Sequence, residues 1–84
     1  MSETAISEQS INLHIGARLR ARRELRRLSS SDLADLTGIS LAELQAIEEG
    51  GAEATPKFLL RAAAVLNVHV RYFFLEYQPR RIAA

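Results

Sequence analysis

The 84-residue chain has no cysteine and no tryptophan, and only two prolines and four glycines. Without cysteine it can form neither disulfide bonds nor cysteine-ligated metal sites, so nothing indicates an oxidising compartment. Apolar runs long enough for a membrane-spanning helix, which needs about 20 residues, are also missing. The polar start, MSETAISEQS, lacks the basic and apolar regions of a signal peptide. The sequence therefore favours a cytoplasmic protein with no membrane segment.

Residues that could perform catalysis or hold a metal are equally scarce. The two histidines, His14 and His69, have no cluster of other metal ligands near them in the sequence. Neither a glycine-rich phosphate loop nor a serine in a nucleophile elbow is present. We therefore expect no enzymatic activity, no metal site and no cofactor.

What the chain does contain is enough apolar material for one small domain. Hydrophobic residues make up 48% of the sequence, which is sufficient for a packed globule. A core of this size leaves a thin margin of stability, so binding a second copy or a ligand would be favourable.

Charge is unevenly distributed, although the net charge is only +1. Residues 16–28 carry six arginines against one acid, Glu24. Residues 29–54 carry six acids and neither lysine nor arginine, and residues 55–84 are mildly basic. The basic and acidic blocks are consistent with solvated helix faces that neutralise each other, and equally with surfaces that bind partners.

Apolar residues recur at helical spacing throughout, without strand-like alternation, and predict an all-α domain over residues 11–77. A flexible N-terminal tail over residues 1–10 and a frayed C-terminal tail over residues 78–84 are expected on either side. The domain is expected to contain five helices, over approximately residues 13–28, 30–37, 41–49, 56–66 and 70–77.

Capping residues mark most of these boundaries. Asn12 is expected to cap the first helix, and Ser29 or Ser30 the second. Ser40 and Glu43 have the S-x-x-E spacing of a capping box at the third. The remaining markers are Thr55 before Pro56 at the start of the fourth helix, and Gly38, Gly50, Gly51 and Asn67 at helix ends.

Residues 28–48, LSSSDLADLTGISLAELQAIE, have the pattern of two short helices joined by a tight turn. Small Ala34 stands where two helices must cross closely, and Gly38 stands in the turn. Leu44 and Ile47 form the inner side of the second helix. These features are typical of a helix-turn-helix, whose second helix can lie in the major groove of DNA.

Four segments of the chain agree in order and spacing with one known family. They are IGARLRARR, LSSSDLADLTGIS, the IEEG at 47–50 and AAAVLNVHVRYFF at 62–74, and they span about 60 of the 84 residues. The chain in this respect resembles the lambda-repressor-like (Cro/CI, or XRE) helix-turn-helix regulators. NLHIGARLRARRELRRLS and VRYFF are most similar to a proteobacterial branch. The resemblance implies a compact five-helix DNA-binding domain.

The resemblance also implies a structural ion pair. Family members pair an arginine of the first helix with a glutamate at the end of the third, and the matching residues here are Arg23 and Glu48. Arg23 shares a helix face with Ile15 and Leu19, four and eight residues earlier. An arginine on that apolar face needs a neighbouring acid, and an ordinary exposed arginine is the alternative.

The family's function implies contacts with double-stranded DNA. Leucine and alanine of the third helix could touch thymine methyl groups, glutamate could accept from cytosine, and glutamine could pair with adenine. Helix N-termini could donate amides to phosphates, and flanking basic side chains could neutralise them. The contacts expected are Ser30, Ser31, Ser40, Leu41, Ala42, Glu43, Gln45, Lys57, Arg18 and Arg22.

The chain departs from the family on this surface. Family members usually have glutamine or another hydrogen-bonding residue where Ser30 stands. They also have polar or basic side chains on the exposed face of the third helix, and the loop after it is often basic. Here neither helix of the pair is basic, and the following loop reads GGAEA. Six acids in this block would repel a duplex. Two functions follow: a homodimeric transcriptional regulator, expected to be a repressor, or a degenerate relative that binds another regulator or protein partner.

The stretch 70–77 contains more apolar residues than one short helix can bury inside its own domain. In the family this region often contributes to the dimer interface. The alternative is that these side chains complete the core over the first helix. The expected interface residues are Val70, Phe73, Phe74, Leu75 and Tyr77.

Overall fold

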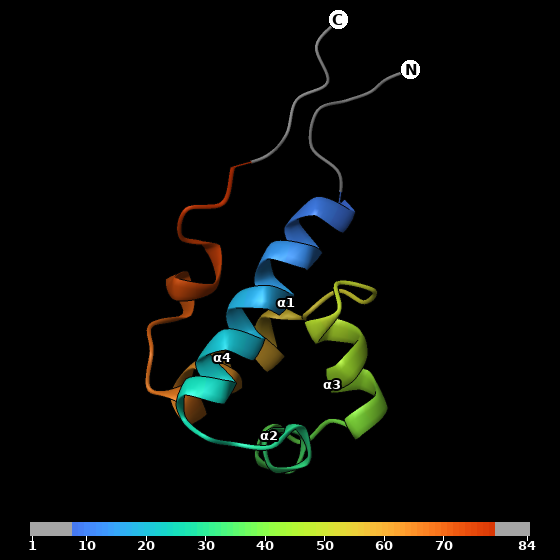
Figure 1. Ribbon diagram of the computed structural model, residues 1–84, viewed down its shortest axis with the longest axis vertical. Coiled ribbons are helices and arrows are strands. Elements are labelled where there is room, and N and C mark those ends of the chain that lie inside the picture. Colours follow the sequence, from blue (N-terminus) through green and yellow to red (C-terminus); the bar gives the residue numbers. More distant parts are fainter. Residues whose placement is uncertain (1–7, 79–84) are drawn as a thin grey trace, which may run out of the picture.

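The computed structural model describes residues 8–78, and all regular structure within this range is helical (Figure 1). The elements are α1 (Glu8–Leu25), α2 (Ser30–Thr37), α3 (Leu41–Glu48), α4 (Pro56–Leu66) and the 3₁₀ helix η1 (Val70–Phe74). An all-helical domain is confirmed, but this part of the chain has four α-helices rather than five.

The fifth element is a short 3₁₀ helix because local hydrogen bonds turn the backbone tightly at its start. The His69 ring accepts from the Arg71 N–H at 3.1 Å, and the Tyr72 N–H donates to the His69 carbonyl at 2.8 Å. The second of these bonds has the three-residue spacing of a 3₁₀ helix. Beyond Phe74 the chain leaves helical geometry, since Leu75 is extended and Glu76 has a φ of 63°. The expected α-helix over 70–77 is therefore wrong.

Helix α1 begins at Glu8 and thus includes three residues of the expected N-terminal tail. Asn12 lies inside the helix, so its expected role as N-cap is wrong. The other expected tail residues, 1–7 and 79–84, lie outside the described residues. Helix α1 ends at Leu25, three residues earlier than expected.

An arginine closes α1 in place of the usual glycine. Arg27 has a φ of 59°, and the Leu28 N–H donates to the Arg23 carbonyl at 3.1 Å. Many helices end in this way, with a hydrogen bond from an N–H to the carbonyl five residues earlier and a left-handed residue between them. A left-handed arginine has no marker in a single sequence, because glycine and asparagine normally occupy this position.

The other helix boundaries follow the capping residues closely. At α2 the Ser29 hydroxyl accepts from the Asp32 N–H at 3.0 Å, and the Asp32 carboxylate accepts in return from the Ser29 N–H, which makes a full capping box. At α3 the Ser40 hydroxyl accepts from the Glu43 N–H, which is half of the expected box. Thr55 caps α4, Pro56 is its first residue, and Gly38 and Asn67 end α2 and α4 with positive φ.

The core lies where α1, α3, α4 and η1 meet, with α2 packed against α3 and α4. Its buried apolar residues are Ile15, Leu19, Leu33, Ala34, Leu44, Ile47, Ala54, Phe58, Leu59, Ala62, Ala63, Leu66 and Phe73. A close crossing of α1 and α3 lies at Gly16. A Cβ at Gly16 would overlap the Ile47 carbonyl oxygen, so the backbones of α1 and α3 lie in close contact there.

Candidate nucleic-acid interface

Helices α2 and α3 form the helix-turn-helix, and their turn is set by Gly38. This residue has a φ of 80° and its N–H donates to the Ala34 carbonyl, so it ends α2 and redirects the chain into α3. Thr37 is 1% exposed, and its hydroxyl donates to the Leu33 carbonyl at 2.6 Å. The turn is therefore rigid and holds α3 at a defined angle to α2.

The outward face of α3 carries the residues that the sequence predicts to read bases. Leu41, Ala42, Glu43 and Gln45 are all exposed. Leu44 and Ile47, on the opposite face, are buried in the core. Because the inner face anchors the helix, the outer face is free to enter a groove.

A polar cleft of about 190 Å³ lies beside this face. Arg20 and Arg23 of α1, Ser30 of α2, and Gln45, Glu48 and Glu49 at or after α3 line it. The cleft thus brings together the first residue of α2 and a base-reading candidate of α3. It also contains Arg20, which the sequence did not single out.

The helical register of α1 explains why Arg20 faces α3. Arg20 and Arg23 follow Gly16 by four and seven residues, so all three lie on one helix face. Gly16 contacts the end of α3, and its two face-mates therefore point the same way. Arg20 makes an exposed pair with Glu24 at 3.1 Å, which leaves the rest of its guanidinium open to other partners. The spacing of Gly16, Arg20 and Arg23 in the sequence therefore predicts that Arg20 faces α3, but only once Gly16 is known to contact α3.

The expected pair of Arg23 and Glu48 is present at the base of the cleft. The Arg23 guanidinium donates to both carboxylate oxygens, at 2.7 and 3.0 Å, and to the Leu28 carbonyl at 2.8 Å. The pair is almost fully buried. Hydrogen bonding to Glu48 raises the pKa of Arg23, against a smaller lowering by desolvation, and keeps the arginine charged. The ion pair ties α1 to α3, and the bond to the Leu28 carbonyl ties Arg23 to the segment between α1 and α2.

Arg18 and Arg22 are not brought to this surface, which corrects their expected role at the DNA. They lie four residues apart on the opposite side of α1. Arg18 donates to the Leu75 carbonyl at 2.7 Å and stacks 4.9 Å above the Tyr72 ring. Arg22 donates to the Leu66 carbonyl at 3.1 Å and caps the C-terminus of α4.

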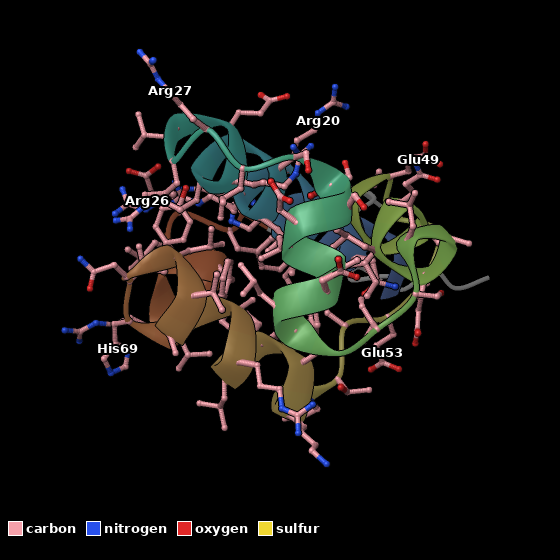
Figure 2. All side chains as sticks on the ribbon, turned by 90° about the horizontal axis from the view of Figure 1, so that it is seen from below. Arg20, Arg26, Arg27, Glu49, Glu53 and His69 are labelled. Carbon is pink, nitrogen blue, oxygen red and sulfur yellow. The ribbon has the colours of Figure 1, made fainter. Side chains whose placement is uncertain are left out.

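The charges around α2 and α3 are only partly neutralised inside the protein. Asp32 caps α2, and Glu48 is paired with Arg23. Within residues 8–78, Asp35, Glu43, Glu49 and Glu53 are exposed and have no ion-pair partner. In Figure 2, Arg26 and Arg27 project on one side of α2, Glu49 and Glu53 project on the other, and Arg20 projects between them. Lys57 is exposed in the first turn of α4.

The residues expected at a dimer interface have different surroundings. Phe73 is fully buried against the domain's own core, so it presents no surface to a second copy and its expected role is wrong. Phe74 and Leu75 are exposed by 42% and 48%. Val70 and Tyr77 are half-buried, and the Tyr77 hydroxyl hydrogen-bonds to Ser10 at 3.1 Å.

Comparison with known proteins agrees with this architecture. A family model described as helix-turn-helix matches residues 19–73. An uncharacterized HTH-type transcriptional regulator of Sinorhizobium medicae is 31% identical over 74 residues, which cover 88% of this chain and 53% of that protein. The chain belongs to the lambda-repressor-like (XRE) helix-turn-helix family.

Solved structures of the family have the same fold. The restriction-modification controller protein C.AhdI from Aeromonas hydrophila is 28% identical, with a TM-score of 0.72 over 75% of this chain and 96% of its own. SinR from Bacillus subtilis, the master regulator for biofilm formation, was solved in complex with DNA. It is 31% identical, with a TM-score of 0.68 over 71% of this chain and 97% of its own.

The family consists of DNA-binding transcriptional regulators and not of enzymes. The chain spans about half the length of the curated relatives it matches, so it corresponds to one part of those proteins. Among the described helices, none has both the length and the apolar character needed to cross a membrane.

Proposed function

We propose that this protein is a sequence-specific, double-stranded DNA-binding transcriptional repressor that acts as a homodimer. The observation that carries the proposal is the exposed face of α3, anchored from behind by buried Leu44 and Ile47 and lying beside a cleft that contains Arg20 and Ser30. The likeness to SinR, which was solved with DNA, supports it.

The proposed contacts combine few cations with helix N-termini. Leu41, Ala42, Glu43 and Gln45 would meet base edges in the major groove. The amides at the starts of α2 and α3, with Ser30, Ser31 and Ser40, would meet phosphates. We add Arg20 to the proposed DNA contacts, and Lys57 would neutralise a flanking phosphate. Arg18 and Arg22 are removed from these contacts.

The proposed dimer uses the apolar surface at the C-terminal side of the domain. Its residues include Val70, Phe74, Leu75 and Tyr77. Leu60 of α4, which is 60% exposed, lines the same surface groove as Phe74. Two copies related by a two-fold axis would cover these side chains and present two α3 helices to successive major grooves.

Fluorescence anisotropy with duplex DNA from the chain's own promoter region tests the proposal. Binding should survive moderate salt and excess random DNA, and the salt slope should correspond to no more than about six neutralised phosphates. Gln45→Ala should weaken specific binding by about 1–3 kcal/mol without changing binding to random DNA. Leu36→Ala is the control, because Leu36 is a neutral, exposed residue of α2 that lies outside the proposed contacts. An absence of binding at low salt would contradict the proposal.

A second function is supported by the acids around α3. In that function the protein binds another regulator or protein partner, and DNA binding is weak or absent. SinR, a relative of similar fold, was also solved in a complex with the SinI protein. Glu43→Lys combined with Glu53→Lys separates the two functions. If the wild-type chain does not bind DNA and this double variant does, the acids are the obstacle and the protein-binding function is favoured.

A further inference from the structure

An apolar groove of about 400 Å³ lies on the side of the domain where α1, α4 and η1 meet the loop after α3. Ile11 and Ile15 of α1, Leu60 of α4 and Phe74 of η1 line it. Asn12 and Glu53 are the polar side chains among its lining residues. Figure 1 shows the ribbons that form it: the first half of α1, with η1 on one side and the loop on the other. Its volume lies within the range of about 300–1,000 Å³ that small-molecule sites occupy.

Charge at the groove is of one sign. Glu53 is exposed at its edge and has no ion-pair partner within the described chain. No lysine or arginine is among the lining residues. The apolar lining favours a ligand with an apolar portion. The carboxylate of Glu53 favours a positively charged group on the same ligand.

We propose that this groove binds a small amphiphilic cation, with an aliphatic or aromatic body between α1, α4 and η1 and an ammonium group at Glu53. Val70 and Phe74 line the groove and also belong to the proposed dimer surface. The ligand and a second copy therefore exclude each other, and binding shifts the protein toward the monomer. This last consequence rests on the proposed function, whereas the binding site does not.

The probes are n-octylammonium and n-octanoate, which have the same chain length and opposite charge, both used below micelle formation. Amide and methyl NMR spectra of the full chain, at a concentration where it is monomeric, report where each probe binds. Octylammonium should shift the resonances of Ile11, Ile15 and Leu60 and bind more tightly than octanoate. Shortening it to n-hexylammonium should weaken binding by up to about fourfold for each methylene removed, which corresponds to 0.8 kcal/mol.

Two variants with matched controls test the walls and the charge separately. Glu53→Gln should reduce the preference for octylammonium over octanoate by about two- to fivefold, as expected for an exposed ion pair. Glu49→Gln, another exposed acid outside the groove, should not. Leu60→Ser should weaken both probes, whereas Leu36→Ser, with 58% exposure on α2, should weaken neither.

Three results would overturn the proposal. One is the absence of groove shifts with any probe. Another is equal affinity for the two charges with no effect of Glu53→Gln. The third is a dimer that no probe dissociates and that Leu60→Ser converts to monomer, which would assign the groove to a second copy alone. DNA anisotropy of the same samples is a separate readout, so failure of the ligand site is distinguishable from failure of DNA binding.

Discussion

The two sides of α1 carry the same residue type for different purposes. On the side facing α3, Arg23 is buried against Glu48 and Arg20 borders the polar cleft. On the other side, Arg18 and Arg22 donate to backbone carbonyls near the ends of η1 and α4. The block of arginines in the sequence is therefore three structural residues and one candidate DNA contact on α1, followed by two exposed arginines, Arg26 and Arg27. Counting cations along a helix thus overstates the charge available to a duplex.

The largest expected effect is on the α3-facing side, at the buried ion pair. Glu48→Ala leaves the Arg23 guanidinium buried and unpaired and should lower the free energy of unfolding by about 3–5 kcal/mol. Thermal or denaturant unfolding measures it. Glu49→Ala is the control, because Glu49 is exposed. An unchanged melting temperature for Glu48→Ala would show that the pair does not hold α1 to α3.

The next effect concerns the contact beneath that pair. Gly16→Ala places a methyl group in overlap with the Ile47 carbonyl oxygen and 2.7 Å from that of Glu48, so one of the two backbones must shift. We expect a loss of about 3 kcal/mol in unfolding free energy, toward the upper end for overpacked sites. Ala17→Gly, at an exposed α1 position, should cost only about 1 kcal/mol. Equal losses for the two variants would contradict a close crossing.

A pair of substitutions separates the two sides directly. Arg22→Ala removes the cap of α4 and should cost about 1–2 kcal/mol of stability, with DNA affinity unchanged for the folded protein. Arg20→Ala should leave stability within about 0.5 kcal/mol but reduce the salt slope of DNA binding by about 0.9. Denaturation and anisotropy at several salt concentrations provide both readouts. The reverse assignment of effects would overturn the division of α1 into two sides.

The smallest effect is at the end of α1. Arg27 is left-handed, so Arg27→Gly should relieve backbone strain and raise the unfolding free energy by about 0.5–1 kcal/mol. Arg26→Gly, at the preceding exposed residue with ordinary φ, should be destabilising instead. Loss of stability in Arg27→Gly would show that the arginine side chain itself contributes to the helix end.

The sequence predicted most of the fold because short-range signals determine most of it. Gly38, Asn67 and the Thr55–Pro56 step mark helix ends through their own conformational preferences, so their positions could be recognised without a structure. The end of α1 at Leu25, followed by left-handed Arg27, and the 3₁₀ form of η1 were not predicted. Neither the left-handed conformation of Arg27 nor the local hydrogen bonds of His69 that shape η1 follows from the usual preferences of those residue types.

The candidate site was predicted unevenly for a similar reason. The outward positions of Ala42 and Gln45 follow from helical periodicity, since Leu44 and Ile47 are buried on the other side of α3. Leu41 lies three residues before Leu44, and it is exposed because it is the first residue of the helix. The basic contacts depend instead on which helix each arginine of α1 faces. This orientation is set by the contact of Gly16 with α3 and by the carbonyls that end α4 and η1. The partners of Arg18, Arg22 and Arg23 on those elements lie 25 or more positions away in the chain.

By itself the sequence determined the helical class, the helix-turn-helix and the family, because periodicity, capping and turn residues act over a few positions. Only the tertiary structure decided which arginines bond to groups within the protein. It also decided that Phe73 belongs to the core and that an apolar groove opens beside Glu53. These features arise from distant segments meeting. The desolvation, close contact and hydrogen bonding that govern them exist only after the chain has folded.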